Sequence, residues 1–250
     1  MILAENMQVC VKKELYMKYD AIIFDVSDTL VEYSPNYAKI YGDRLRNLGF
    51  IISNDKAKEI SRIINWTICE QTRIEQLGEP HITKVELNTL VDKAALSCVM
   101  DKEMSKKEYL SILSLLPIPE QKMTIIPGVI NVLKVLKEKY RLAIVSNHYS
   151  WLKDYLDDIG LTAYFEMVII SEIVGVSKPD IRILQIALDE LGLESKQCLY
   201  VGDQPYDVLC SKQIGMDCVW INVDNVELPE VISFREDYRI NNILELLDIV

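Results

Sequence analysis

The chain has 250 residues, of which 50% are hydrophobic and 26% are charged, and this composition excludes a disordered protein. The formal net charge of -11 argues against binding to nucleic acid or to anionic lipid. No apolar run reaches the roughly 18 residues of a membrane span, and the first residues lack the features of a signal peptide. Together with six scattered cysteines without a CxxC pair, these features predict a cytoplasmic protein with no membrane or nucleic acid partner.

Short apolar runs alternate with helix-like stretches over most of the chain. The first run, residues 19–24 (YDAIIF), ends at Asp25, and we interpret residues 1–18 before it as an N-terminal extension. Further runs occupy residues 141–146, 166–171, 198–203 and 217–222. Strands that alternate with helices predict an α/β fold with a Rossmann-like, doubly wound parallel sheet.

Residues 35–120 lack the strand pattern and show the apolar spacing of helices. Helix starts and ends are indicated by capping boxes and glycines, at Thr83–Glu86, Ser105–Glu108, Gly49 and Gly78. We therefore expect a four-helix insert that forms a second, smaller domain. The core would comprise residues 19–34 and 121–250, with linkers near residues 33–35 and 117–124.

Ligands of open α/β sheets bind beyond the carboxyl ends of the strands, so the residues that follow each run are candidates for a site. Asp25 leaves the first run into a polar turn, and Asp203 and Asp207 lie four residues apart after a later one. Carboxylate oxygens in this arrangement could hold one hard cation such as Mg²⁺. Helix capping is the alternative for Asp25 and Asp207.

Two further strand ends carry groups that suit an anionic ligand. Ser146 and Asn147 could donate hydrogen bonds to phosphoryl oxygens, although Ser and Asn also serve turns and caps. Lys178 precedes a helix whose first turn we expect at Pro179, where a cation opposes the helix dipole. Lys178 therefore has no obvious structural purpose, and an ordinary surface lysine is the alternative.

In this order the four segments resemble the four motifs of the haloacid dehalogenase superfamily, whose members mostly transfer phosphoryl groups through an aspartyl phosphate. The long interval between Asp25 and Ser146 leaves room for the inserted helices, which resemble the C1-type cap of subfamily I. The resemblance covers the chain from residue 19 onward. It implies a Mg²⁺-dependent phosphohydrolase that acts on a small phosphorylated substrate.

The resemblance also implies the role of each site residue. Asp25 would be the nucleophile, and Ser146 and Lys178 would bind the phosphoryl group and assist the reaction. Asn147 would line the substrate site together with His148. The implied Mg²⁺ ligands are Asp25, the backbone carbonyl of Ser27, Asp203 and Asp207, the last one in the second shell or through water.

The sequence departs from the family pattern at Ser27, where phosphatases usually carry the aspartate that acts as general acid and base. Loss of such a group typically slows a reaction by about 10²- to 10⁴-fold. Substrates with good leaving groups, a replacement acid such as His81, or a weak or inactive ligand-binding or regulatory homologue are all compatible with Ser27. We expect Asp28 to be structural, with its side chain turned away from Ser27. A metal-free 2-haloacid dehalogenase is the remaining alternative.

Overall fold

The computed structural model describes residues 18–76, 79–100, 108, 110–223, 225, 227–228 and 232–250. The strands are β1 (Ala21–Phe24), β2 (Val31–Ser34), β3 (Lys122–Ile125), β4 (Arg141–Ser146), β5 (Met167–Ile170), β6 (Cys198–Gly202), β7 (Asp217–Ile221) and β8 (Tyr238–Ile240). The α-helices are α1 (Tyr37–Asn47), α2 (Asn54–Gln76), α3 (Lys84–Ser97), α5 (Val129–Lys137), α6 (Trp151–Asp158), α7 (Ser171–Val174), α8 (Arg182–Leu191) and α9 (Pro205–Gln213). None of the described helices combines the length and the apolar character that a membrane span needs.

Six strands form one parallel sheet in the order β5-β4-β1-β6-β7-β8. This arrangement confirms the predicted Rossmann-like α/β fold. β1 lies between β4 and β6, and its four residues are all buried, so a continuous apolar run is what this position requires. The carboxyl ends of β4, β1 and β6 consequently meet at one edge of the sheet.

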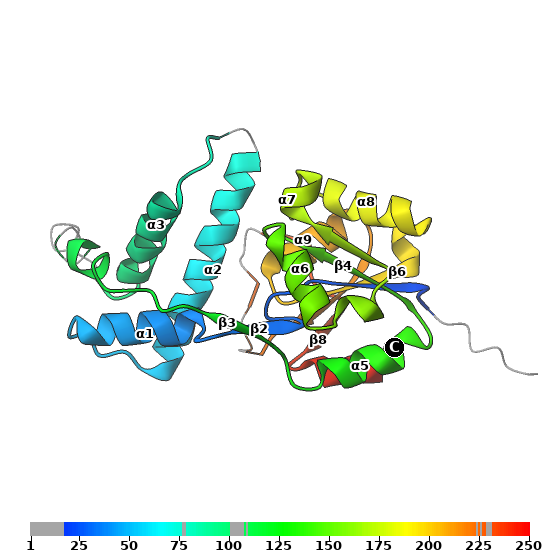
Figure 1. Cartoon of the computed structure of the whole chain (residues 1–250), viewed down its shortest axis with the longest axis horizontal. Coiled ribbons are helices and arrows are strands. Elements are labelled where there is room, and N and C mark those ends of the chain that lie inside the picture. The colour runs from blue at the N-terminus through cyan, green and yellow to red at the C-terminus, as the bar shows by residue number, and fades with distance from the viewer. Residues whose placement is uncertain are drawn as a thin grey trace, which may run out of the picture.

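Helices cover both faces of this sheet (Figure 1). Along β1, Ile22 and Phe24 pack with residues of α5 and α6, whereas Ala21 and Ile23 pack with residues of α8 and α9. Successive side chains of a strand point to opposite faces, so one short run serves two hydrophobic cores. Both cores are therefore fixed by the same strand that ends at Asp25.

Helices α1, α2 and α3 lie to one side of the sheet and share a separate hydrophobic core (Figure 1). The predicted capping box at Thr83 and Glu86 opens α3. Residues 108 and 110–113 are helical, but the start predicted at Ser105 and the helix end predicted at Gly78 lie outside the described residues. The exact domain boundaries stay a prediction.

A two-stranded antiparallel ribbon, β2 with β3, connects the helical unit to the sheet. The linkers predicted near residues 33–35 and 117–124 overlap this ribbon in part: residues 33–34 and 122–124 pair as strands, whereas residues 117–121 are irregular. The pairing places Tyr33 opposite Met123. A hydrogen-bonded ribbon holds Tyr33 in a defined position, which a flexible linker would not do.

Candidate active site

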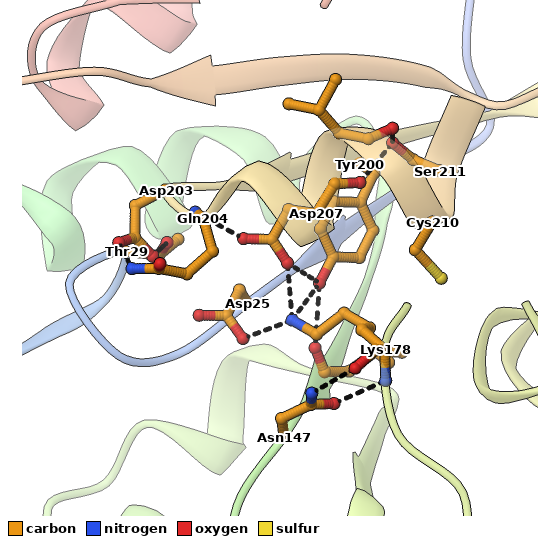
Figure 2. Close-up of polar contacts among 12 residues, drawn as sticks. Asp25, Thr29, Asn147, Lys178, Tyr200, Asp203, Gln204, Asp207, Cys210 and Ser211 are labelled. Atoms are coloured by element: carbon orange, nitrogen blue, oxygen red, sulfur yellow. Dashed lines mark hydrogen bonds and ion pairs between the residues drawn. The ribbon is translucent and has the colours of Figure 1, made fainter. Parts of the chain in front are cut away.

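The predicted carboxylates converge at the carboxyl edge of the sheet (Figure 2). The backbone N–H of Asp25 still donates to the carbonyl of Val201 at 2.9 Å, so Asp25 continues the sheet by one residue beyond β1. Asp25, Asp203 and Asp207 each offer a carboxylate oxygen, and these atoms all lie within 4.8 Å of one another. Three hard oxygen donors at this spacing fit the ligand preference of Mg²⁺.

Lys178 lies at the centre of a buried polar cluster (Figure 2). Its Nζ donates to Asp25 Oδ1 at 2.7 Å, to Asp207 Oδ1 at 2.6 Å and to the Tyr200 hydroxyl at 2.8 Å. Burial alone would lower the pKa of Lys178, but the charges of Asp207 and Asp25 hold it well above its usual value. Lys178 is therefore a buried cation fixed against the carboxylates and not a surface lysine.

The backbone around Lys178 is held by Asn147. The Asn147 amide donates from Nδ2 to the Lys178 carbonyl at 2.7 Å, and its Oδ1 accepts from the Lys178 N–H at 2.7 Å. Helix α8 begins at Arg182, so Pro179 does not occupy its first turn as predicted, and a turn precedes the helix instead. Asn147 thus positions Lys178, while its predicted contact with substrate stays a prediction.

Asp207 lies in the first turn of α9, and both of its oxygens are engaged. Oδ2 accepts a hydrogen bond from the backbone N–H of Gln204 at 2.9 Å, and this bond caps the start of the helix. Oδ1 accepts from Lys178. The capping alternative is therefore confirmed for Asp207, and the same carboxylate also belongs to the cluster around Lys178. Gly202 permits this arrangement, because a Cβ at that position would overlap the Asp207 carboxylate.

The charge balance of this cluster favours a bound cation. Burial raises the pKa of Asp203 well above its ordinary value, and the charges of Asp28, Asp25 and Asp207 add to the effect. Burial likewise raises the pKa of Asp207, against the opposing charge of Lys178. One lysine does not balance the charges of three carboxylates, and a divalent cation among these oxygens would offset the repulsion that remains between them.

The cluster forms part of the wall of a cavity of about 2290 Å³ between the sheet edge and the helical unit. Ser27, Asp28, Ser146 and His148 also line it, so the predicted substrate-binding residues face one space. Asp28 has a left-handed backbone with φ 55° and lines the same cavity as Ser27, while the expected direction of its side chain, away from Ser27, stays a prediction. Surrounding protein atoms and the charges of Asp25 and Glu32 raise the pKa of Asp28 to about 6.

Three aromatic residues that we did not assign to the site contribute to it. Tyr200 bonds Lys178 from within β6, and Tyr33 on β2 lies 2.9 Å from His148 Nε2. Tyr206 at the start of α9 donates to Glu70 of α2 at 2.7 Å and thereby connects the sheet to the helical unit. In contrast, the proposed replacement acid His81 is exposed, pairs with Glu75 and does not line the cavity.

Comparison with known proteins agrees with this geometry. A family model described as haloacid dehalogenase-like hydrolase matches residues 22–221. The pyrimidine 5'-nucleotidase YjjG of Escherichia coli (strain K12) is 34% identical over 113 residues, which are 44% of this chain and 50% of that protein. The chain thus spans about half the length of this relative. A phosphoglycolate phosphatase of Aquifex aeolicus is 28% identical over 203 residues, which are 78% of this chain and 91% of that protein.

Solved structures share the fold over nearly the whole chain. A HAD phosphatase from Thermococcus onnurineus has 26% identity and a TM-score of 0.54, and the match covers 92% of this chain and 97% of that one. The L-2-haloacid dehalogenase RSc1362 has a TM-score of 0.67 at 18% identity, with coverage of 94% and 99%. At that identity the second likeness shows the fold alone.

Proposed function

The chain belongs to the haloacid dehalogenase-like hydrolase family, and from this premise we propose that it is a Mg²⁺-dependent phosphohydrolase acting on a small phosphorylated molecule. The observation that carries the proposal is the cluster in which Lys178 bonds Asp25 and Asp207 while Asp203 lies beside them. Phosphoryl transfer depends mainly on positioning and on neutralising charge, and this cluster supplies both.

Asp25 is the nucleophile in this proposal. Lys178 holds Oδ1, which orients the carboxylate and leaves Oδ2 to attack the phosphorus atom. An O–P bond forms to Asp25 as the bond to the leaving oxygen breaks. Water then attacks the same phosphorus atom, the bond from phosphorus to Asp25 breaks, and phosphate and the free Asp25 carboxylate are released. Ser146 binds the phosphoryl oxygens during both steps, and the positive charge of Lys178, whose three N–H groups are donated to Asp25, Asp207 and Tyr200, helps to neutralise them.

The Mg²⁺ ligands in this proposal are Asp25, Asp203 and the backbone carbonyl of Ser27. Asp207 would act through a water, because Lys178, Tyr200 and the Gln204 N–H already engage its oxygens. When bound, the ion neutralises charge on the phosphoryl oxygens. The carbonyl of residue 27 does not depend on the side chain, so Ser27 is compatible with a metal site.

Ser27 limits which substrates react well. A serine hydroxyl does not protonate a leaving oxygen at neutral pH, so we expect acyl phosphates or phosphoanhydrides to react faster than sugar phosphates. The nucleotidase and phosphatase names of the relatives support phosphate monoesters as a substrate class. A 2-haloacid dehalogenase would not need the acidic group formed with Asp203 and Asp207.

Phosphate release from acetyl phosphate, p-nitrophenyl phosphate and glucose 6-phosphate tests the proposal. The assay compares the wild type, Asp25→Asn and Ser27→Asp, with Mg²⁺ and with EDTA. We expect turnover that requires Mg²⁺ and Asp25, and a faster sugar phosphate reaction in Ser27→Asp. Halide release from a 2-haloacid without metal would favour the dehalogenase, and ligand-induced stabilisation without turnover would favour a binding homologue.

A further inference from the structure

The loop after β4 begins at the acidic cluster and carries three ring side chains. Its first residue, Asn147, bonds the Lys178 backbone through both atoms of its amide (Figure 2). His148, Tyr149 and Trp151 follow within four residues, and all three line the same cavity as the cluster. A substrate held at the cluster by its phosphoryl group therefore has aromatic side chains close by.

Tyr149 and Trp151 expose large aromatic surfaces. Their exposed fractions are 61% and 48%, although both rings are mainly apolar. The His148 ring lies between them in contact, edge-on to Trp151 with centroids 4.7 Å apart and edge-on to Tyr149 at 6.1 Å. Aromatic rings in proteins attract one another in this edge-to-face geometry. One more planar ring, supplied by a ligand, would extend the group in the same way.

Hydrogen bonds to α7 hold this loop in place. The backbone N–H of His148 donates to Ser171 Oγ at 3.0 Å, and the backbone N–H of Ser150 donates to the Glu172 carboxylate at 2.8 Å. On the other side, Nε2 of the His148 ring lies 2.9 Å from the Tyr33 hydroxyl of β2. A loop that is held before a ligand arrives loses less conformational freedom on binding, so its rings are suited to recognition.

Ser27 restricts the leaving group independently of the rings. A phenol such as the tyrosine side chain has a pKa of about 10, and an aliphatic alcohol is a far weaker acid. A phenolate can therefore leave from phosphorus without first being protonated, and protonation is what Ser27 does not supply. An ester of phosphate with a phenol meets both conditions, because it is a monoester with a good leaving group and a planar ring.

We infer that the substrate is a small aryl phosphate, a phenol esterified with phosphate, whose ring lies against Tyr149 and Trp151. The inference rests on the proposed phosphohydrolase function and names its substrate class. As the O–P bond to Asp25 forms, the bond from phosphorus to the phenol oxygen breaks and the phenolate keeps its electron pair. Water then attacks phosphorus and the bond to Asp25 breaks. Over both steps the two protons of the water are divided between the phenol and the phosphate.

Three substrates separate the ring from the leaving group in assays with Mg²⁺. Phenyl phosphate has both features, benzyl phosphate keeps the ring but must release an alkoxide, and acetyl phosphate has a good leaving group without a ring. We expect kcat for phenyl phosphate to exceed kcat for benzyl phosphate by about 10²-fold or more, and Ser27→Asp to narrow this gap by protonating the alkoxide. Equal kcat values for these two esters, or an unchanged gap in Ser27→Asp, would overturn the inference.

Tyr149→Leu and Trp151→Leu remove the rings but keep apolar side chains. Each should raise KM for phenyl phosphate by about 3- to 10-fold with little change in kcat, and leave kcat/KM for acetyl phosphate unchanged. The matched control is Ile173→Ala, because Ile173 on α7 is also an exposed apolar residue but does not line the cavity, and it should alter neither reaction. Equal losses with phenyl and acetyl phosphate would indicate a structural role of the rings and overturn the inference.

The remaining outcomes distinguish this inference from the function on which it rests. Uridine 5'-phosphate carries its ring one sugar away from the phosphate and releases an alkoxide, so a higher kcat/KM for it than for phenyl phosphate would overturn the aryl assignment. Turnover of acetyl phosphate without turnover of phenyl phosphate would overturn the inference alone. No turnover of either compound by the wild type or by Ser27→Asp would overturn the phosphohydrolase function and the inference with it.

Discussion

Replacing Lys178 with Met tests how much the buried cation stabilises the acidic cluster. The side chains of Lys178, Asp25 and Asp207 are only 4%, 7% and 1% exposed, and Nζ lies 2.7 and 2.6 Å from the two carboxylates. Removing one partner of a buried ion pair costs about 3–5 kcal/mol. Two carboxylates lose their partner here, so we expect the upper part of that range, a large share of the roughly 5–15 kcal/mol that stabilises a typical protein.

Urea unfolding in EDTA at pH 5 and pH 8 measures this cost. Because the pKa of Lys178 is raised in the folded protein, the stability that its charge contributes is fully present below pH 10.5, its ordinary pKa. This contribution is lost only as the pH rises through the raised pKa. In Lys178→Met the pKa of Asp207 rises further, because the charge of Lys178 no longer lowers it, and ionisation of Asp207 then destabilises the fold more, so the loss should be larger at pH 8.

Lys39→Met is the matched control for this measurement. Lys39 pairs with Asp43 at 3.0 Å, but their side chains are 68% and 50% exposed. Such a pair contributes about 0.3–0.5 kcal/mol. If Lys178→Met costs no more than Lys39→Met, or loses the same free energy at both pH values, the reasoning about the buried cluster is refuted.

Three further predictions concern the metal, the Lys178 loop and the contact with the helical unit. Mg²⁺ at tenfold its Kd should stabilise the wild type by about 1.4 kcal/mol, with less effect at lower pH because the raised pKa of Asp203 favours its protonated form. If Mg²⁺ raises the melting temperature of Asp203→Asn as much as that of the wild type, this prediction is wrong. Asn147→Ala should cost about 1–3 kcal/mol in urea unfolding, since it removes both bonds to the Lys178 backbone, and an unchanged midpoint would count against that role. Tyr206→Phe should speed hydrogen exchange in α2 by up to about tenfold through loss of the bond to Glu70, whereas unchanged exchange would show that the bond is not stabilising.

The sequence predicts the sheet well where burial is complete. Central parallel strands such as β1 and β6 are buried on both faces, so each appears as a continuous apolar run. β2 and β8 escaped prediction because they are short and carry polar residues such as Glu32 and Arg239. Their pairing depends on partners that are distant in the sequence, which local patterns do not reveal.

The same distinction applies to the candidate site. Asp25, Asp203 and Lys178 could be placed together because the ends of parallel strands meet at one edge. The contribution of Tyr200 could not be predicted, because its hydroxyl reaches Lys178 from within an apolar run. Tyr33 was missed because its position depends on the β2–β3 ribbon, which the sequence indicated only as a linker.

The central claim is that Asp25 carries the phosphoryl group during turnover. Mixing the protein with acetyl phosphate and Mg²⁺, quenching in acid within milliseconds and analysing the peptides by mass spectrometry tests it directly. The account predicts a phosphoryl adduct on the peptide that contains Asp25, labile to hydroxylamine and absent from Asp25→Asn. Phosphate release without an adduct on that peptide, or an adduct that persists in Asp25→Asn, would contradict it.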